Sequence, residues 1–289
     1  MSTATNQLPP PPKMDKELSG HSWQDWFYKL WIQVQNMNNY DLNAIAAGQI
    51  ANKSIVRVYG TTSPQTVQNA RLDVWPLCNT IPTYIFPAAA ARMWIVSDSA
   101  NDTAAGTGVR TLMIHYLDST YTAKEETITL NGTTAVQTVG SILRVNELHS
   151  VTVGSGGVAA GNITLQDTAA APTNKYSYIV AGYNKSEQAV YTVPTGKTGY
   201  ISFATLSSGS TSGTHYTRFF LRTTSDEDGT LYPGVFNIQA VAGSLNSNEA
   251  MNLLPPIKIP ATADVKISVI SDAANANVTA DVFLMGWIE

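Results

Sequence analysis

The sequence predicts a mainly β protein: an antiparallel β-sandwich or jelly-roll body of one or two modules, behind an N-terminal extended arm and one amphipathic Trp-rich helix. From residue 70 onward, short segments of alternating apolar and polar residues are separated by turns rich in Gly, Pro and Asn. No helical pattern intervenes between them, as is typical of sandwiches and jelly rolls. Only 13% of the 289 residues are charged, against roughly 25% in an ordinary soluble protein.

The first 18 residues are expected to form the arm. Pro9, Pro10, Pro11 and Pro12 follow one another and favour an extended polyproline helix, which cannot donate hydrogen bonds to a sheet. Two interpretations stay open. The arm is either a spacer or a peptide that lies in a groove on another protein.

One helix is expected directly after the arm. Ser22 is a suitable N-cap, and Asp25 suits the first turn of a helix. At about 100° per residue, six large apolar side chains fall on one face. They are Trp23, Trp26, Phe27, Leu30, Trp31 and Val34. Such a stripe either packs on its own domain or serves docking or oligomerisation, and its place on the N-terminal arm favours the second interpretation.

A series of strands follows, and Ser54–Tyr59, closed by Gly60, is the first. The clearest later ones are expected at 93–96, 109–116, 126–130, 142–145, 151–153, 163–165, 189–193, 200–204, 217–222, 235–241, 265–270 and 278–285. The Ala- and Pro-containing stretch 167–175 is the best internal boundary. We therefore expect an arm with its anchoring helix at 1–60 and two β-sandwich modules at 61–175 and 176–289.

Gly196-Lys197-Thr198 resembles the end of a nucleotide-binding phosphate loop. The full pattern requires a glycine where Tyr191 stands, and the loop must open a helix. Pro194 also removes one amide donor. Because strand-like segments flank residues 194–197, the tripeptide is expected to lie in a hairpin turn without a phosphate role.

We expect no catalytic, cofactor-binding or metal-binding residues, and therefore no enzyme. The four histidines are His21, His115, His149 and His215, and no two have metal-ligand spacing. Glu125 and Glu126 are adjacent, so on a strand they point to opposite faces. A site assembled from distant residues is left open by the sequence.

Charge and targeting signals restrict the partners. The net charge is −4 and no block of Lys or Arg occurs, so nucleic acid is not an expected partner. Cys78 is the single cysteine, which rules out an intrachain disulfide. Neither a signal peptide nor a run of about 20 apolar residues is present, so we expect neither secretion nor membrane insertion.

Several segments together resemble β-rich virion structural proteins of tailed bacteriophages, of the fibre or capsid-decoration type found in aquatic phages. They are "SDSANDTAAGTGVRTLMIHYLD", "EETITLNGTT", "LRVNELHSVTVGSGGVAAGNITL" and "YIVAGYNKSEQAVYTVPTGKTGYI", within roughly residues 85–205, and the opening "SWQDWFYKLWIQV". The resemblance carries over no catalytic residues.

This resemblance implies a non-enzymatic, homotrimeric fibre or decoration protein. It would be assembled in the host cytoplasm and joined to other virion proteins, on the capsid or the tail, through its arm and helix. One alternative is a tail module that binds a receptor or a carbohydrate, such as a host surface glycan. The other is a β-structured hydrolase, for which a carboxylate pair across one cleft would be the distinguishing feature.

Overall fold

The structure, a computed structural model, describes residues 25–30, 42–63, 67, 70–211, 213–272 and 278–289. The chain divides into two compact units, Met1–Ile55 and Val56–Glu289. In the first unit, residues 25–30 and 42–46 are helical. The second unit contains the sheets and is called the body below.

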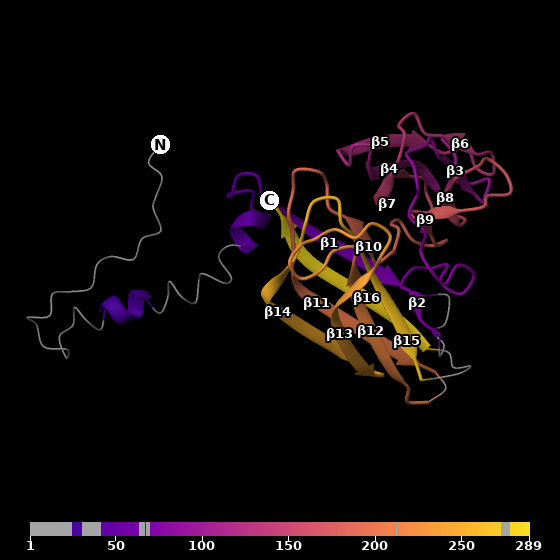
Figure 1. The fold of residues 1–289 in the computed structure, drawn as a ribbon. Helices are drawn as coiled ribbons and strands as arrows, with labels where there is room; N and C mark the ends of the chain where they lie inside the picture. The colour runs from indigo at the N-terminus through magenta and orange to yellow at the C-terminus, as the bar shows by residue number, and fades with distance from the viewer. Residues whose placement is uncertain (1–24, 31–41, 64–66, 68–69, 212, 273–277) are drawn as a thin grey trace, which may run out of the picture. The chain divides into compact units, whose positions relative to one another are not determined.

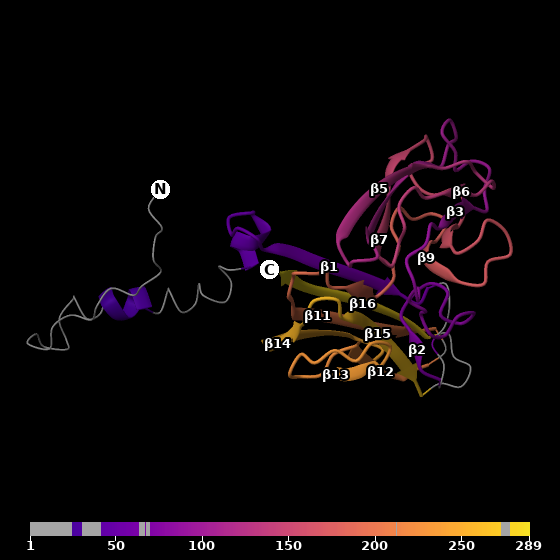
Figure 2. The same ribbon diagram turned by 45° about the horizontal axis from the view of Figure 1, so that its top comes forward.

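The chain is mainly β with antiparallel sheets, which confirms the predicted fold class. Part of the body is a sandwich of two sheets, which Figure 2 shows as two layers. The first sheet has the order β1–β16–β11–β14 and consists of β1 (Ser54–Thr61), β16 (Val278–Ile288), β11 (Gly199–Ser210) and β14 (Asn248–Ile259). The second has the order β10–β15–β12–β13, with β2 also pairing with β15, and consists of β10 (Val190–Thr192), β15 (Asp264–Ser271), β12 (Tyr216–Thr223), β13 (Asn237–Leu245) and β2 (Leu72–Asp73).

Alternation along the strands builds the core between these two sheets. Val278, Ala280, Val282 and Leu284 are buried, and every second residue of β16 therefore faces inward. The facing layer contributes the odd-numbered apolar residues of β15 and of β12 to the same hydrophobic cluster. Burial of each Val, Leu, Ile or Phe side chain in this cluster contributes about 1.5–3 kcal/mol.

Strands β3 to β9, which lie between β2 and β10 in the chain, form an insert with two sheets of its own (Figure 1). One sheet has the order β6–β3–β8–β9 and consists of β6 (Val136–Gln137), β3 (Trp94–Ser97), β8 (Ile163–Gln166) and β9 (Lys175–Ile179). The other has the order β5–β4–β7 and consists of β5 (Ala123–Thr129), β4 (Val109–Leu117) and β7 (Arg144–Val153). A second hydrophobic cluster lies in the insert, with Ile95 and Leu165 from one sheet and Leu112, Ile114 and Leu148 from the other.

Polar contacts connect the insert to the sandwich. The Arg144 side chain on β7 forms an ion pair with Asp264 on β15, with 2.7 Å between Nε and Oδ1. The Asn146 side chain exchanges two hydrogen bonds with the backbone of Thr192. The Tyr84 hydroxyl donates to the carbonyl oxygen of Tyr176 at 2.6 Å. Since the two hydrophobic clusters are distinct, these contacts are a major link between the parts.

This arrangement differs from the expected division at 61–175 and 176–289. β9 crosses the expected boundary and belongs to the insert, where Tyr176 and Ile179 join its cluster. Val67 and several apolar residues from Leu72 to Tyr84 belong instead to the sandwich cluster. The first unit ends at Ile55 rather than residue 60, because β1 pairs with β16. The strands expected at 142–145 and 151–153 are one strand, β7.

Candidate functional site

Three of the six expected docking residues lie within the described helix at 25–30. Trp26 and Leu30 are half-buried, whereas 52% of Phe27 is exposed. The rings of Trp26 and Phe27 meet edge to face with centroids 5.1 Å apart. Trp23, Trp31 and Val34 lie outside the described residues, so the six-residue stripe stays a prediction. Neither described helix is long and apolar enough to span a membrane.

Two further features belong to this helix. Lys29 and Asp25, four residues apart, form an ion pair of 2.6 Å that supports the turn. Tyr28 was not among the expected docking residues, yet 60% of it is exposed. At about 100° per residue, Tyr28 falls outside the stripe.

The body has a pocket of about 390 Å³ with acidic and aromatic side chains, which we call the carboxylate pocket. Its lining residues come from β1, β11, β14, β16 and the segment before β10, and they are Tyr59, Gly60, Thr61, Glu187, Thr205, Ser207, Asn248, Asp281, Val282 and Phe283. The rings of Tyr59 and Phe283 lie 4.8 Å apart. Hydroxyl, amide and carboxylate groups beside aromatic rings are suited to binding a polar ligand such as a sugar.

Two carboxylates, those of Glu187 and Asp281, line this pocket. Burial raises the pKa of Glu187, and the nearby negative charge of Asp281 raises it further. The Asp281 carboxylate accepts a hydrogen bond from the Thr61 hydroxyl at 2.6 Å. Sequence reasoning missed this pair because strand pairing brings together residues that are distant in the chain. Both residues line one pocket, and the hydrolase alternative would require such a pair to face each other across a cleft.

The structure also brings two histidines together. His115 on β4 and His149 on β7 stack with ring centroids 5.1 Å apart. With Glu147 they offer ligand atoms within 4.8 Å of one another, and imidazole and carboxylate are zinc ligands. However, Glu147 already forms ion pairs with His149 at 2.9 Å and with Lys185 at 2.6 Å. Sequence spacing missed this cluster because two neighbouring strands supply it.

The Gly196-Lys197-Thr198 segment is a turn between strands, as predicted. Gly196 has a φ of 70°, and the backbone N–H of Lys197 donates to the carbonyl oxygen of Pro194 at 3.2 Å. The hairpin prediction is wrong, because β10 pairs with β15 while β11 pairs with β14 and β16. The turn therefore connects the two layers of the sandwich. A strand follows it rather than a helix, so the phosphate-loop interpretation fails.

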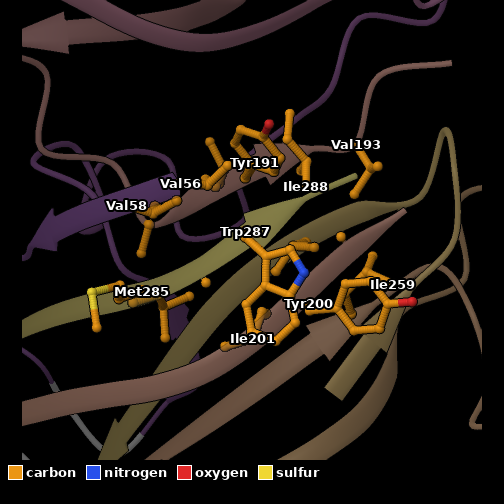
Figure 3. A pocket seen from close by; sticks show the side chains of 16 residues that line it. Val56, Val58, Tyr191, Val193, Tyr200, Ile201, Ile259, Met285, Trp287 and Ile288 are labelled. Atoms are coloured by element: carbon orange, nitrogen blue, oxygen red, sulfur yellow. The ribbon is translucent and has the colours of Figure 1, made fainter. Parts of the chain in front are cut away.

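An apolar cavity lies between the two sheets (Figure 3). Val58, Tyr191, Ile201, Ile259 and Met285 are among its lining residues. The rings of Tyr200 and Trp287 stack beside it, with centroids 4.9 Å apart. Its volume of about 40 Å³ is far below the roughly 300–1,000 Å³ of small-molecule sites, so we interpret it as a packing gap rather than a ligand site.

Comparison with known proteins does not assign the chain to a family. No known protein family matches it, and no curated protein matches it. A structure of infectious bursal disease virus strain Gx aligns with 81% of this chain and 76% of its own, at 8% identity and a TM-score of 0.19. A structure of strain Gt of the same virus aligns with 82% of this chain and 76% of its own, at 8% identity and a TM-score of 0.18. Because TM-scores this low do not indicate a common fold, neither likeness contributes to the argument about function.

Proposed function

We propose that the protein is a non-enzymatic structural component of a tailed-phage virion. It acts as an oligomeric fibre or decoration protein, a homotrimer assembled in the host cytoplasm. The N-terminal arm and helix attach it to the capsid or tail, and the β body is presented to the surroundings. The resemblance of residues 85–205 to phage virion proteins is the basis for naming this class.

The observation that carries the proposal is the separation of the N-terminal segment from the body. The first unit ends at Ile55, before most of β1, and the body contains both hydrophobic clusters. The helix at 25–30 exposes about half of the Phe27 side chain. Exposed large aromatic side chains on a helix are suited to a partner surface, because interface energy concentrates in such residues.

A complementation assay tests the attachment. The double variant Trp26→Ala with Trp31→Ala should remain folded by circular dichroism yet be absent from purified virions. Tyr28→Ala is the matched control, because it removes an exposed aromatic ring outside the stripe and should be incorporated normally. Normal incorporation of the double variant would refute docking through the stripe, and loss of the β signal would show that the helix belongs to the core.

The oligomeric state and position need separate measurements. Light scattering of the purified protein should give three times the 31.0 kDa of one chain. A monomeric mass in solution and in the particle would refute the trimer. The number of copies per virion then distinguishes the two positions. A capsid decoration protein should be present in a number set by the capsid lattice, whereas a tail fibre should be present in a small number set by the symmetry of the tail.

The carboxylate pocket favours a second candidate function, a tail module that binds host surface glycans. Its aromatic rings and polar groups fit a sugar better than they fit an apolar ligand. A glycan pull-down with wild-type protein and with Asn248→Ala distinguishes this function from a purely structural one. Release of reducing sugar by wild-type protein, lost in Glu187→Gln, would instead support the hydrolase alternative.

A further inference from the structure

A second, larger pocket lies where the insert meets the sandwich, and we call it the junction pocket. Its volume is about 740 Å³, within the roughly 300–1,000 Å³ typical of small-molecule sites. Tyr121 and Arg144 of the insert contribute to it, and β2, β12 and β15 of the sandwich supply most of its charged groups. These groups are Arg71, Asp73, Arg144, Arg222, Asp264 and Lys266.

The charges of the junction pocket do not balance. Among its lining residues there are four cationic groups and two carboxylates, which leaves two positive charges. Arg144 and Asp264 form a bidentate pair and neutralise each other. Asp73 is thus the remaining carboxylate for three cations. Its Oδ2 lies 2.7 Å from Lys266 Nζ, and its Oδ1 lies 3.8 Å from Arg222 Nη1. This excess occurs in a chain whose net charge is −4.

Strand register forces these cations together. Arg222 on β12 stands directly opposite Lys266 on β15, and like charges in that position destabilise a sheet. Both side chains lie on the face of their strands that turns away from the apolar core. Burial lowers the pKa of Lys266; the ion pair with Asp73 opposes this shift, and the nearby charges of Arg222 and Arg71 add to it. Burial and the charge of Arg71 likewise lower the pKa of Arg222.

Several donors at the pocket remain unused. Within the described part of the chain, the buried Nε of Arg222 has no hydrogen-bond partner, while its Nη1 donates to the Ser268 hydroxyl at 3.1 Å. Arg71 is exposed, and its guanidinium has no hydrogen-bond or ion-pair partner among the described residues. The Phe236 ring makes cation–π contacts with both residues: Lys266 Nζ lies 4.2 Å and the Arg222 guanidinium 5.5 Å from the ring centroid. The cations are therefore positioned while their charge is only partly neutralised.

We propose that the junction pocket binds an anionic group, a carboxylate or a phosphate, on a ligand of about monosaccharide size. Such a group would accept hydrogen bonds from the guanidinium of Arg71 and from that of Arg222, whose Nη1 already donates to Ser268. Guanidinium groups bind both anions in bidentate geometry. The bound charge would offset the repulsion among Arg71, Arg222 and Lys266. The site is separate from the N-terminal attachment surface, so the inference does not depend on the proposed function.

Calorimetric titration of the full-length protein tests the site with three probes: glucuronate, inorganic phosphate and neutral glucose. We expect at least one anion to bind and glucose not to bind. Arg71→Ala should weaken anion binding about tenfold or more, because a hydrogen bond to a charged group contributes roughly 1.5–3 kcal/mol. Arg57→Ala is the matched control, an exposed arginine on β1 outside the pocket, and should bind like wild type.

The two anions distinguish the sources of the ligand. Tighter binding of glucuronate assigns the site to a carboxylate-bearing sugar, and tighter binding of phosphate assigns it to a phosphate group. Arg222→Gln provides a second variant that should also lose binding, and thermal denaturation verifies that each variant is folded. The inference is overturned if neither anion binds at millimolar concentration, if glucose binds as tightly as the anions, or if folded Arg71→Ala and Arg222→Gln bind like wild type.

Discussion

We expect Arg144→Ala to destabilise the protein by about 3–5 kcal/mol, the usual effect of removing one partner from a buried ion pair. The side chains of Arg144 and Asp264 are 11% and 7% exposed. Their contact is bidentate, with Nε 2.7 Å from Oδ1 and Nη2 3.0 Å from Oδ2. Arg144 Nη1 also donates to the carbonyl oxygens of Pro87 and Leu143. Truncation would therefore leave several buried acceptors without their donor.

The magnitude depends mainly on the carboxylate that remains. After truncation, the Thr192 hydroxyl, 2.6 Å from Oδ1, is the remaining hydrogen-bond donor to the Asp264 carboxylate among the described residues. An ionised carboxylate with one donor in a buried position is strongly unfavourable. Adding Asp264→Asn removes that charge, so the double variant should be more stable than Arg144→Ala alone. This non-additivity would identify the unpaired charge as the cause.

Equilibrium urea denaturation measures both effects. Arg57→Ala is the control, and this exposed site should change the free energy of unfolding by less than about 0.5 kcal/mol. A loss below about 1 kcal/mol in Arg144→Ala would refute the reasoning, since it would place the pair among surface salt bridges. An additive double variant would refute the role assigned to Asp264.

Three further changes test other parts of the body. Because burial and Asp281 raise the pKa of Glu187, the folded protein binds this proton more tightly than the unfolded chain. The stability that this proton contributes is present below the ordinary pKa of 4.5 and is lost as the pH rises through the pKa of the folded protein. In urea denaturation, Glu187→Gln should therefore be more stable than wild type at pH 7 but not below pH 4.5. Equal stability of the two proteins at pH 7 would contradict this. Burial raises the pKa of the Cys78 thiol to about 12, so iodoacetamide at pH 8 should modify Cys78 only after unfolding. Mass spectrometry measures the modification, and alkylation of the folded protein would contradict this prediction. In Gly60→Ala the new Cβ would lie 2.6 Å from the backbone nitrogen of Ala189. The variant should therefore lose about 1–3 kcal/mol of stability, measured as a lower melting temperature. An unchanged melting temperature would show that the backbone adjusts without cost.

Local alternation predicted most of the strands correctly. The expected segment 278–285 lies within β16, and 109–116 lies within β4. In both, period-2 apolar residues pack on one hydrophobic cluster, so the local pattern and the tertiary environment agree. The alternation does not indicate which strands pair with each other. The prediction of a hairpin at 194–197 is wrong for this reason, since its two flanking strands belong to different sheets.

β14 shows where local rules fail. Its twelve residues, Asn248–Ile259, include Pro255 and Pro256, and proline normally argues against a strand. In the structure β14 is at the edge of its sheet, where it pairs with β11 on one side. The register is also irregular between Ile201 and Phe203 of β11. An edge strand tolerates the missing amide donors, but the sequence does not reveal which strand is at an edge.

The charged residues of the junction were missed for a related reason. The alternation in β15 predicts that Val265 and Ile267 face a core, and by the usual rule Asp264 and Lys266 would face solvent. Instead all four are buried, and side chains from other segments pair with the two charged ones, Asp73 with Lys266 and Arg144 of the insert with Asp264. A buried polar face needs partners that arrive from elsewhere in the chain, here Asp73 and Arg144, and neither is close in sequence.

This burial also explains why charged and hydrogen-bonded side chains connect the insert to the sandwich, beside the packing of Tyr178 of β9 on the sandwich cluster. An apolar junction would have merged the two hydrophobic clusters, whereas the clusters remain distinct. Ion pairs and hydrogen bonds depend on direction, so Arg144 and Asp264 specify one orientation of β7 relative to β15. The same strand, β15, carries Lys266 into the cluster of unbalanced cations. An anion bound beside Arg71 and Arg222 would therefore lie against the strand that anchors the insert, and its charge would stabilise the element on which the insert's position depends.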